Sequence, residues 1–183
     1  MRPRIVHCSM LVLLVLAGCA ETRISGDAER QAQALHAAVP GAIDCAEFGS
    51  APIEVEARAA GGIGGSRATV GSALKIRLHA LGAVFPVVTP GRKEKHDARF
   101  AGLVPFRVDA GGTYTVLVAS LAWADLAEEN PARLVEPLGF KWVEACGKRF
   151  KSGLYALEPG RDYVVQLWDS PDRELAVMVR RLR

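Results

Sequence analysis

This chain of 183 residues contains a serine close to a lysine, a pair that could act as a nucleophile and its base. Ser72 precedes Lys75 by three positions, the spacing of a serine nucleophile and its lysine base in some acyl-transfer enzymes. That motif opens a helix and needs S-D-N and K-T-G companions, neither of which occurs here. Lys75 instead belongs to an alternating apolar and charged run, which favours a strand. We therefore expect no active serine.

The histidines are the next candidates. His96 and Asp97 are neighbours with the residue types of a general base and its orienting acid, but their polar surroundings favour solvated side chains. His79 lies on the polar side of a strand pattern, where a surface histidine is expected. A metal-assisted enzyme using His79, His96 and an acid is thus the least favoured hypothesis. We expect no enzymatic activity and no cofactor.

The first 18 residues predict export. Arg2 and Arg4 precede an uninterrupted apolar run from Met10 to Leu16, which is far shorter than the ~20 residues that span a bilayer. This layout is typical of a secretory signal peptide, and Cys8 is discarded with it. Cleavage leaves 165 of the 183 residues and lowers the formal charge from +3 to +1, since two arginines and no acids leave. The charge therefore gives no reason to expect nucleic acid as a partner.

The segment Leu16-Ala17-Gly18-Cys19 resembles the lipobox of bacterial lipoproteins at all four positions. The resemblance implies cleavage before Cys19, a thioether-linked diacylglycerol on its thiol and acylation of the new amino group. Two or more acyl chains give a lasting anchor, because each buried CH₂ contributes about 0.8 kcal/mol. The residue after the cysteine is Ala20 rather than Asp, which in lipoproteins of this kind favours transfer to the outer membrane. We expect a protein anchored at the periplasmic face of that membrane, with residues 19–26 as its tether.

Cys45 and Cys146 are the cysteines left over. In the oxidising compartment that export implies, a disulfide between them is the simplest assignment, and it has a single connectivity. Two unpaired buried thiols are the alternative. Metal binding by two cysteines without a nearby histidine is not expected.

Two segments are candidates for a binding surface. One is a basic loop that contains Arg92, Lys93, Lys95 and His96, which could meet anionic lipid headgroups, lipopolysaccharide phosphates or peptidoglycan carboxylates, although a solvated loop is the simpler interpretation. The other is the apolar run 80–88, which is either buried or a docking site for a partner.

The tryptophans are candidates for stacking on sugar rings. Trp168 is the best of them, because the inward positions of its strand are taken by Tyr163, Val165 and Leu167. For Trp123 and Trp142, packing in the core is the expected role. A carbohydrate- or peptidoglycan-binding module is therefore the second hypothesis for this chain.

These residues must be positioned by one short helix and a set of strands. Apolar residues spaced for one helical face predict a helix over Asp27–Val39, which Pro40-Gly41 ends, so that residues 27–41 form a helical unit. The pattern then alternates with period two. Eight strands are expected, at Ile53–Arg58, Leu74–His79, Phe100–Val108, Tyr114–Ala119, Leu121–Leu126, Arg149–Leu157, Tyr163–Trp168 and Leu175–Arg180.

Strands with one polar face, separated by Gly, Pro and Asn turns, predict a mainly β domain over residues 42–183. The expected architecture is an antiparallel two-layer β-sandwich, and a jelly-roll strand order is compatible with the spacing. Two turns are similar, at 108–116 and 157–165, and in each a tyrosine enters the following strand. We expect two hairpins in which the tyrosine ring is buried and its hydroxyl reaches the turn backbone.

The stretch Gly112–Val179 also resembles a group of small, uncharacterised periplasmic proteins of proteobacteria. The matching residues are Gly112-Thr113-Tyr114, Ala122-Trp123-Ala124-Asp125, Cys146, Pro159-Gly160 with Tyr163, and Val177-Met178-Val179. These motifs are mostly structural, so the resemblance implies a fold more than a function. Our leading hypothesis is an outer-membrane lipoprotein without catalytic activity that has a binding or structural role in the cell envelope, with envelope proteins or peptidoglycan as its candidate partners.

Overall fold

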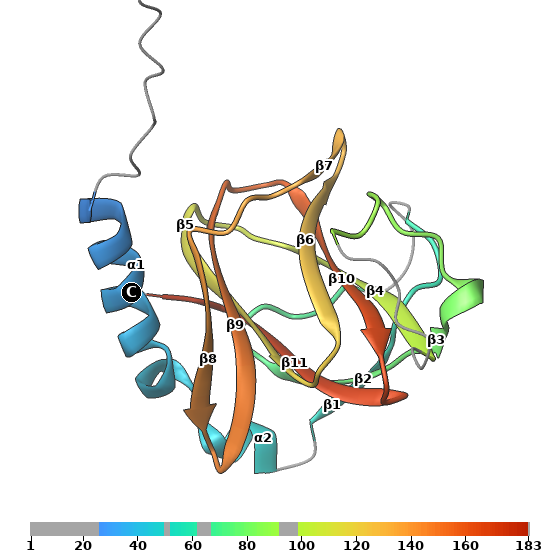
Figure 1. The fold of residues 1–183 in the computed structure, drawn as a ribbon, viewed down its shortest axis with the longest axis horizontal. Coiled ribbons are helices and arrows are strands. Elements are labelled where there is room, and N and C mark those ends of the chain that lie inside the picture. The colour runs from blue at the N-terminus through green and yellow to red at the C-terminus, as the bar shows by residue number, and fades with distance from the viewer. Residues whose placement is uncertain (1–25, 50–51, 62–66, 92–98, 183) are drawn as a thin grey trace, which may run out of the picture.

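The computed structural model describes residues 26–49, 52–61, 67–91 and 99–182. Within these ranges two sheets pack face to face as a β-sandwich with one main helix, which confirms the expected fold (Figure 1). The predicted signal peptide, Cys19 and all of the tether except Gly26, which begins a helix, lie outside the described residues. The basic loop with Arg92, Lys93, Lys95 and His96 also lies outside them.

The two sheets contain eleven described strands. The six-stranded sheet has the order β1 (Ile53–Glu56), β2 (Ala73–Arg77), β11 (Glu174–Arg181), β5 (Gly112–Ala119), β9 (Lys148–Leu157) and β8 (Gly139–Ala145). The five-stranded sheet has the order β3 (His79–Ala80), β4 (Phe100–Arg107), β10 (Asp162–Ser170), β6 (Trp123–Glu129) and β7 (Ala132–Leu134). Neighbouring strands are antiparallel, except that β1 runs parallel to β2 at the edge of its sheet.

Alternation along the strands builds the core between the sheets. On β10, Tyr163, Val165 and Leu167 point inward and are fully buried, as the sequence pattern predicts. The ring of Tyr163 stacks on Phe106 of β4 at 5.7 Å between centroids. Burying each such aromatic ring contributes about 1.5–3 kcal/mol, so this layer contributes substantially to stability.

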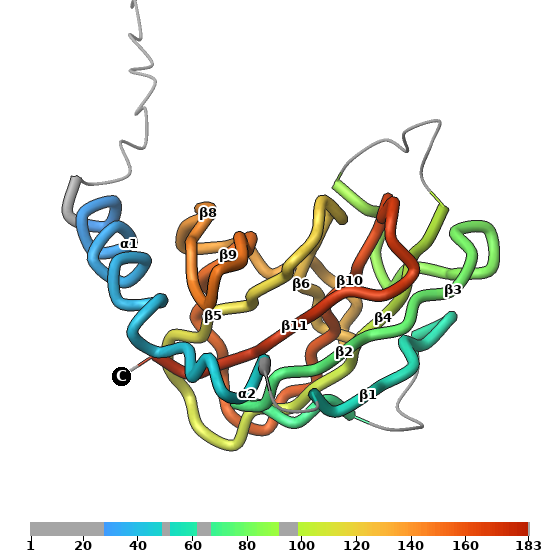
Figure 2. The backbone as a smooth tube through the Cα atoms, turned by 90° about the horizontal axis from the view of Figure 1, so that it is seen from below, coloured from blue at the N-terminus to red at the C-terminus, as the bar shows by residue number. Residues whose placement is uncertain are grey.

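Helices cover the outer face of the six-stranded sheet. α1 (Gly26–Ala38) occupies the predicted helical segment, and the 3-10 helix η1 (Pro40–Ala42) and α2 (Cys45–Gly49) follow it (Figure 2). Phe48 of α2 packs against Phe150 of β9 at 5.1 Å between ring centroids. A disulfide joins Cys45 to Cys146, which confirms the predicted pairing and fastens α2 to the turn between β8 and β9. No described helix has both the length and the apolar character needed to cross a membrane.

His36 is a polar side chain buried where α1 meets the sheet. Its Nδ1 lies 3.4 Å from the Ser152 hydroxyl, which is hydrogen-bonded to Thr115 at 3.0 Å. Its Nε2 lies beside the backbone of Gly139 and has no hydrogen-bond partner among the described atoms. Burial lowers the pKa of His36, and the charge of Lys141 lowers it further, while the Gly139 backbone acts in the opposite direction. The neutral imidazole is therefore the form that fits this interface.

We expect acid to weaken the packing of α1 through His36. The folded-state pKa lies below the unfolded value of about 6.5, so the unfolded chain takes up the proton first as the pH falls. The stabilisation is fully present above that value and is lost as the pH drops through it toward the folded-state pKa. Urea unfolding at about pH 8 and pH 5 should show a larger loss for the wild type than for His36→Gln. Equal losses in the two proteins would contradict this origin.

The two tyrosine turns differ from the prediction in one respect. The Tyr114 hydroxyl donates to the Ala110 carbonyl at 2.6 Å, and the Tyr163 hydroxyl accepts from the Glu158 N–H at 2.9 Å, so the predicted contacts with the turn backbone are confirmed. The turns are not hairpins, however. β4 and β5 lie in different sheets, and so do β9 and β10, so each turn carries the chain across the sandwich. Alternation determines which face is buried, but it does not determine which sheet a strand joins.

Candidate functional site

Trp168 is buried, with only 6% of its surface exposed, so the prediction that it is free to stack on a sugar is wrong. Its side chain does lie on the opposite face of β10 from the core, but a further layer covers that face. Val84, which follows the 3-10 helix η2 (Leu81–Ala83), packs there with Val164 and Trp168. The buried Gln166 side chain holds this cover in place through hydrogen bonds with the backbone of Val88 at 3.0 and 3.2 Å. The apolar run 80–88 is therefore partly a lid over the sheet.

The histidine hypothesis gains no support from the described residues. His79 is half-buried, and its Nε2 lies 2.6 Å from the carbonyl oxygen of Ala57, which ties β3 to the segment after β1. His96 lies outside the described residues. Across the described ranges, no group of three His, Cys, Asp or Glu side chains is arranged to hold a metal ion.

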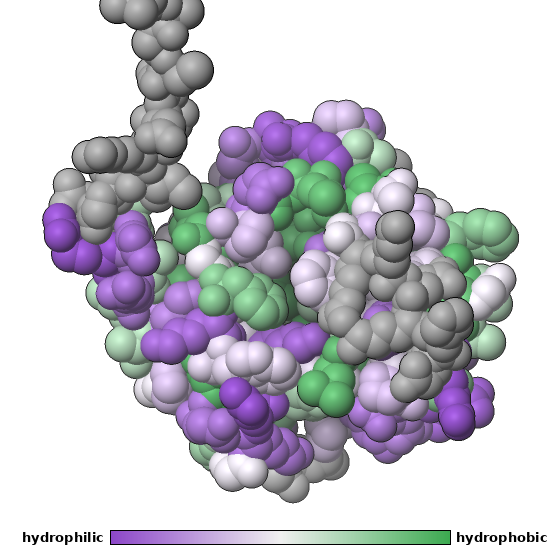
Figure 3. Space-filling view, viewed as in Figure 1, coloured by the Kyte–Doolittle hydropathy of each residue, from purple (hydrophilic) through white to green (hydrophobic). Residues whose placement is uncertain are grey.

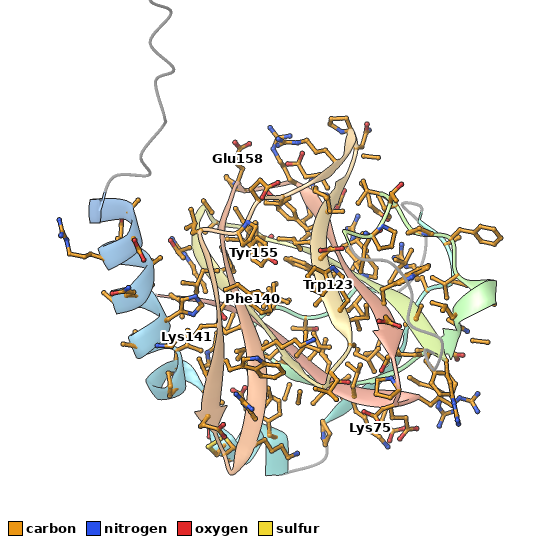
Figure 4. All side chains as sticks on the ribbon, viewed as in Figure 1. Lys75, Trp123, Phe140, Lys141, Tyr155 and Glu158 are labelled. Atoms are coloured by element: carbon orange, nitrogen blue, oxygen red, sulfur yellow. A yellow bond between two sulfur atoms is a disulfide. The ribbon has the colours of Figure 1, made fainter. Side chains whose placement is uncertain are left out.

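A cleft opens between the two sheets at the end where β8 and β7 are the edge strands. Its volume is about 610 Å³, and it is lined by residues of β6, β8, β9 and the segment 134–137. Figure 4 shows Phe140 and Tyr155 projecting from β8 and β9 toward β6, where Trp123 lies. In Figure 3, apolar surface gathers in a hollow between these strands. From the six-stranded sheet the lining receives inner-face side chains of β8 and β9, among them Phe140 and Tyr155, and at β6 it reaches an edge of the five-stranded sheet.

The rim of the cleft carries large apolar side chains that face solvent. Leu121, Leu134 and Phe140 line it and are 70%, 39% and 52% exposed, and Leu138 lies in the same segment at 49%. In the described part of the chain, the remaining exposed large apolar residues are Ile53 and Phe85. Exposed apolar surface that is clustered, rather than scattered, marks an interaction site.

Lys151 lies at one end of the cleft and is held in place by the backbone. It is 8% exposed, and its ammonium group donates to the carbonyl oxygens of Leu121, at 2.9 Å, and of Ala122. The same ammonium lies 5.5 Å from the ring centre of Trp142, and the Arg149 guanidinium lies 4.7 Å from it. The ring of Trp142 in this wall therefore already contacts two cationic side chains of the protein itself.

Two acidic residues, Asp125 and Glu136, border the cleft, and the side chain of Asp125 lies on the outer face of β6 beside Gly91. Asp125 accepts hydrogen bonds from the indole N–H of Trp123 at 2.9 Å and from the backbone N–H of Gly91 at 3.1 Å. Glu136 is exposed and also lines the cleft. Burial raises the pKa of Tyr155, and the charges of Asp125 and Glu136 raise it further, so the phenol stays neutral and both carboxylates act on it.

Gly153 makes room for the ring of Tyr155. Lys151, Gly153 and Tyr155 alternate on one face of β9, which is the face that lines the cleft. A Cβ atom on Gly153 would lie 2.7 Å from Cε2 of Tyr155 and 2.8 Å from its hydroxyl oxygen. The ring therefore lies over the glycine along the strand, and it forms the floor of the cleft instead of filling it.

Sequence reasoning assigned these residues to other roles. Trp142 was expected in the core, but it is half-buried and lines the cleft. Trp123 is also half-buried and borders the cleft, but its side chain packs on the outer face of β6 with the cluster that contains Trp168. β8 was not predicted as a strand, although the aromatic residues at 140 and 142 alternate with Lys141. That alternation is the pattern that could have revealed the wall of the cleft.

No family model matches the chain, and no curated protein is significantly similar to it. The geometry of the cleft is therefore the basis for a functional proposal.

Proposed function

We propose that this protein is a lipid-anchored binding protein of the bacterial envelope that holds a largely apolar ligand in the cleft between its sheets. The observation that carries the binding role is the cluster of exposed Leu121, Leu134 and Phe140 around one cavity. A volume of about 610 Å³ lies within the usual range for small-molecule sites. Such sites have mainly apolar walls with few polar groups, which is the composition found here.

The anchor in this proposal rests on the lipobox resemblance of residues 16–19. Cys19→Ser removes the thiol that would carry the diacylglycerol, so we expect the protein to move from the membrane fraction to the soluble fraction. Fractionation of cells that express each form, followed by immunoblotting, measures this. Cys8→Ser is the matched control and should leave the distribution unchanged. Membrane association that persists in Cys19→Ser would argue against the anchor.

The cleft can be tested with N-phenyl-1-naphthylamine, a neutral apolar dye whose fluorescence rises on binding. Two exposed phenylalanines give a matched pair, because Phe140 lines the cleft at 52% exposed and Phe85 lies elsewhere at 70%. We expect Phe140→Ser to weaken dye binding by about tenfold and Phe85→Ser to leave it unchanged, since a buried ring contributes about 1.5 kcal/mol or more. Equal effects of the two substitutions would show that the dye does not bind in the cleft.

Carbohydrate binding is the second candidate, and the presence of Trp123 and Trp142 in the lining favours it. Purified peptidoglycan should then retain the wild-type protein but not Trp142→Ala. Absence of retention for the wild type would remove this candidate without affecting the first.

A further inference from the structure

We propose that the cleft opens onto the membrane that carries the anchor, and that the hydrocarbon chains of membrane lipids are its ligand. This inference rests on the proposed function, because it names the ligand class and the orientation of the same anchored cleft. It is carried by the place where the chain enters the described fold, by the closure of only one side of the sandwich and by the balanced charges around the cleft.

The tether holds the cleft close to the bilayer. Cys19 precedes Gly26, where α1 begins, by seven positions. Seven residues span at most about 25 Å even when fully extended, which is less than the diameter of a small domain, about 30 Å. Figure 2 shows the N-terminal end of α1 on the same side of the molecule as β8, and this is the side from which Figure 3 views the cleft. A lipid on Cys19 therefore keeps the cleft side of the domain near the membrane.

The helix that follows the tether packs directly on a strand that forms the rim. A Cβ atom on Gly139, the first residue of β8, would lie 3.2 Å from the Cβ of Ala32 and 3.1 Å from Nε2 of His36, both on α1. The next residue, Phe140, points to the opposite face of the strand and lines the cleft. The apolar rim therefore lies beside the point at which the chain is attached to the membrane.

The sandwich is closed on the side away from the cleft and open on the cleft side. After β1 the chain leaves the six-stranded sheet and joins the five-stranded sheet, through two backbone hydrogen bonds between Arg58 and Leu103 of β4, at 2.8 and 2.9 Å. In the described part of the chain, no backbone hydrogen bond joins β7 to β8, the edge strands on the cleft side. The exposed side chains of Leu134 and Phe140 at this open side are left for a partner to cover.

The charges around the cleft are balanced, which favours hydrocarbon over a charged headgroup as that partner. They are Glu136 and Lys151 in the lining and, beside it, the ion pairs of Arg149 with Glu144 and of Arg133 with Glu128. The carboxylate of Asp125 faces the outer side of β6. Attraction to anionic headgroups needs an excess of Lys and Arg, each worth about 1 kcal/mol near the surface. Apolar side chains instead contribute about 1.5–3 kcal/mol each when they are fully buried in hydrocarbon.

Quenching of tryptophan fluorescence by brominated phospholipids tests whether the cleft meets hydrocarbon, because bromine quenches only indoles close to it. The mature lipidated protein is reconstituted into phosphatidylcholine vesicles with plain or with brominated acyl chains. Trp142 is the reporter, since it lines the cleft. We expect the brominated chains to lower the emission of the wild type, and most of this loss to disappear in Trp142→Phe.

A matched set of rim variants separates the cleft from the anchor. The double substitution Leu134→Ser/Phe140→Ser should reduce the quenching severalfold while the protein stays on the vesicles through Cys19. Phe85→Ser, which changes an exposed phenylalanine away from the cleft, should be quenched as strongly as the wild type.

Equal emission in plain and brominated vesicles would overturn the inference, while dye binding would still support the apolar cleft. In that case, a dimer that is lost in Leu134→Ser/Phe140→Ser would assign the rim to a second copy. Quenching that is unchanged in Trp142→Phe would show that another face meets the bilayer. Quenching that requires anionic phosphatidylglycerol would overturn hydrocarbon in favour of headgroups. Protein with an intact Cys19 that stays off the vesicles would overturn the anchor and this inference together.

Discussion

Replacing Cys45 and Cys146 by serine is expected to lower the free energy of unfolding of the folded domain by about 4–5 kcal/mol. The disulfide closes a loop whose ends are 101 positions apart in the sequence. In the chain-entropy description, a cross-link over such a distance removes much of the freedom of the unfolded chain, and the effect grows with the logarithm of the loop length. A typical domain is stable by about 5–15 kcal/mol, so the loss would be a large fraction of the total.

The place of the disulfide in the fold adds to this effect. Cys45 begins α2, and Cys146 lies in the turn between β8 and β9, so the bond holds the helical layer against the edge of the six-stranded sheet. Phe48 and Phe150 pack together close to it. Without the bond, this edge should become the first part of the sandwich to open.

Urea unfolding of the soluble domain, with residues 1–19 removed, measures the prediction. The wild type in the presence of reductant should unfold at the same urea concentration as the Cys45→Ser/Cys146→Ser variant, and reductant should have no effect on the variant. A variant as stable as the oxidised wild type would show that the cross-link adds nothing to the fold.

Local sequence patterns were sufficient to predict a β-sandwich and the buried face of each strand. They were not sufficient to predict which segments cover the outer face of a sheet. The alternation of Tyr163, Val165 and Leu167 identified the inward face of β10, because side chains on a strand alternate with period two. The same pattern placed Trp168 on the outer face, which is where it lies. What covers that face is Val84 and its neighbours, about 80 residues away in the sequence. Periodicity contains no information about contacts at that distance, so burial of Trp168 could not be predicted from it.

The cleft was invisible to sequence reasoning for a related reason. It is lined by strands of two different sheets, and sheet membership could not be inferred from the spacing of the turns. The sequence around a residue such as Trp142 has the same composition and alternation whether the side chain is packed in a core or lines a cleft. Gly153 is the clearest example of this limit of local patterns. An isolated glycine in a strand indicates only a bulge or the close approach of another group, without identifying that group. The structure identifies the approaching group as the ring of Tyr155.

Gly153→Ala is expected to destabilise the wild type by about 1–3 kcal/mol, the usual cost of overpacking a core. The added methyl group would lie 2.7 Å from Cε2 of Tyr155, which is too close for two carbon atoms, so the ring must move. Tyr155 is only 4% exposed and packs in the main core, so it cannot move away freely on that side. The open direction is the cleft, and the displaced phenol should also weaken dye binding.

The Tyr155→Ala background reverses the expected sign for the same substitution. With the ring gone, the methyl group has room, and alanine is better than glycine in a strand by about 0.5–1 kcal/mol because it has less freedom to lose on folding. A double-mutant cycle measured by urea unfolding gives the coupling between the two positions. Gly82→Ala, where a methyl group meets nothing within 4 Å, is the control and should show no coupling with Tyr155. If Gly153→Ala is equally costly in both backgrounds, something other than the tyrosine ring requires the glycine, and the floor of the cleft is not held by this contact.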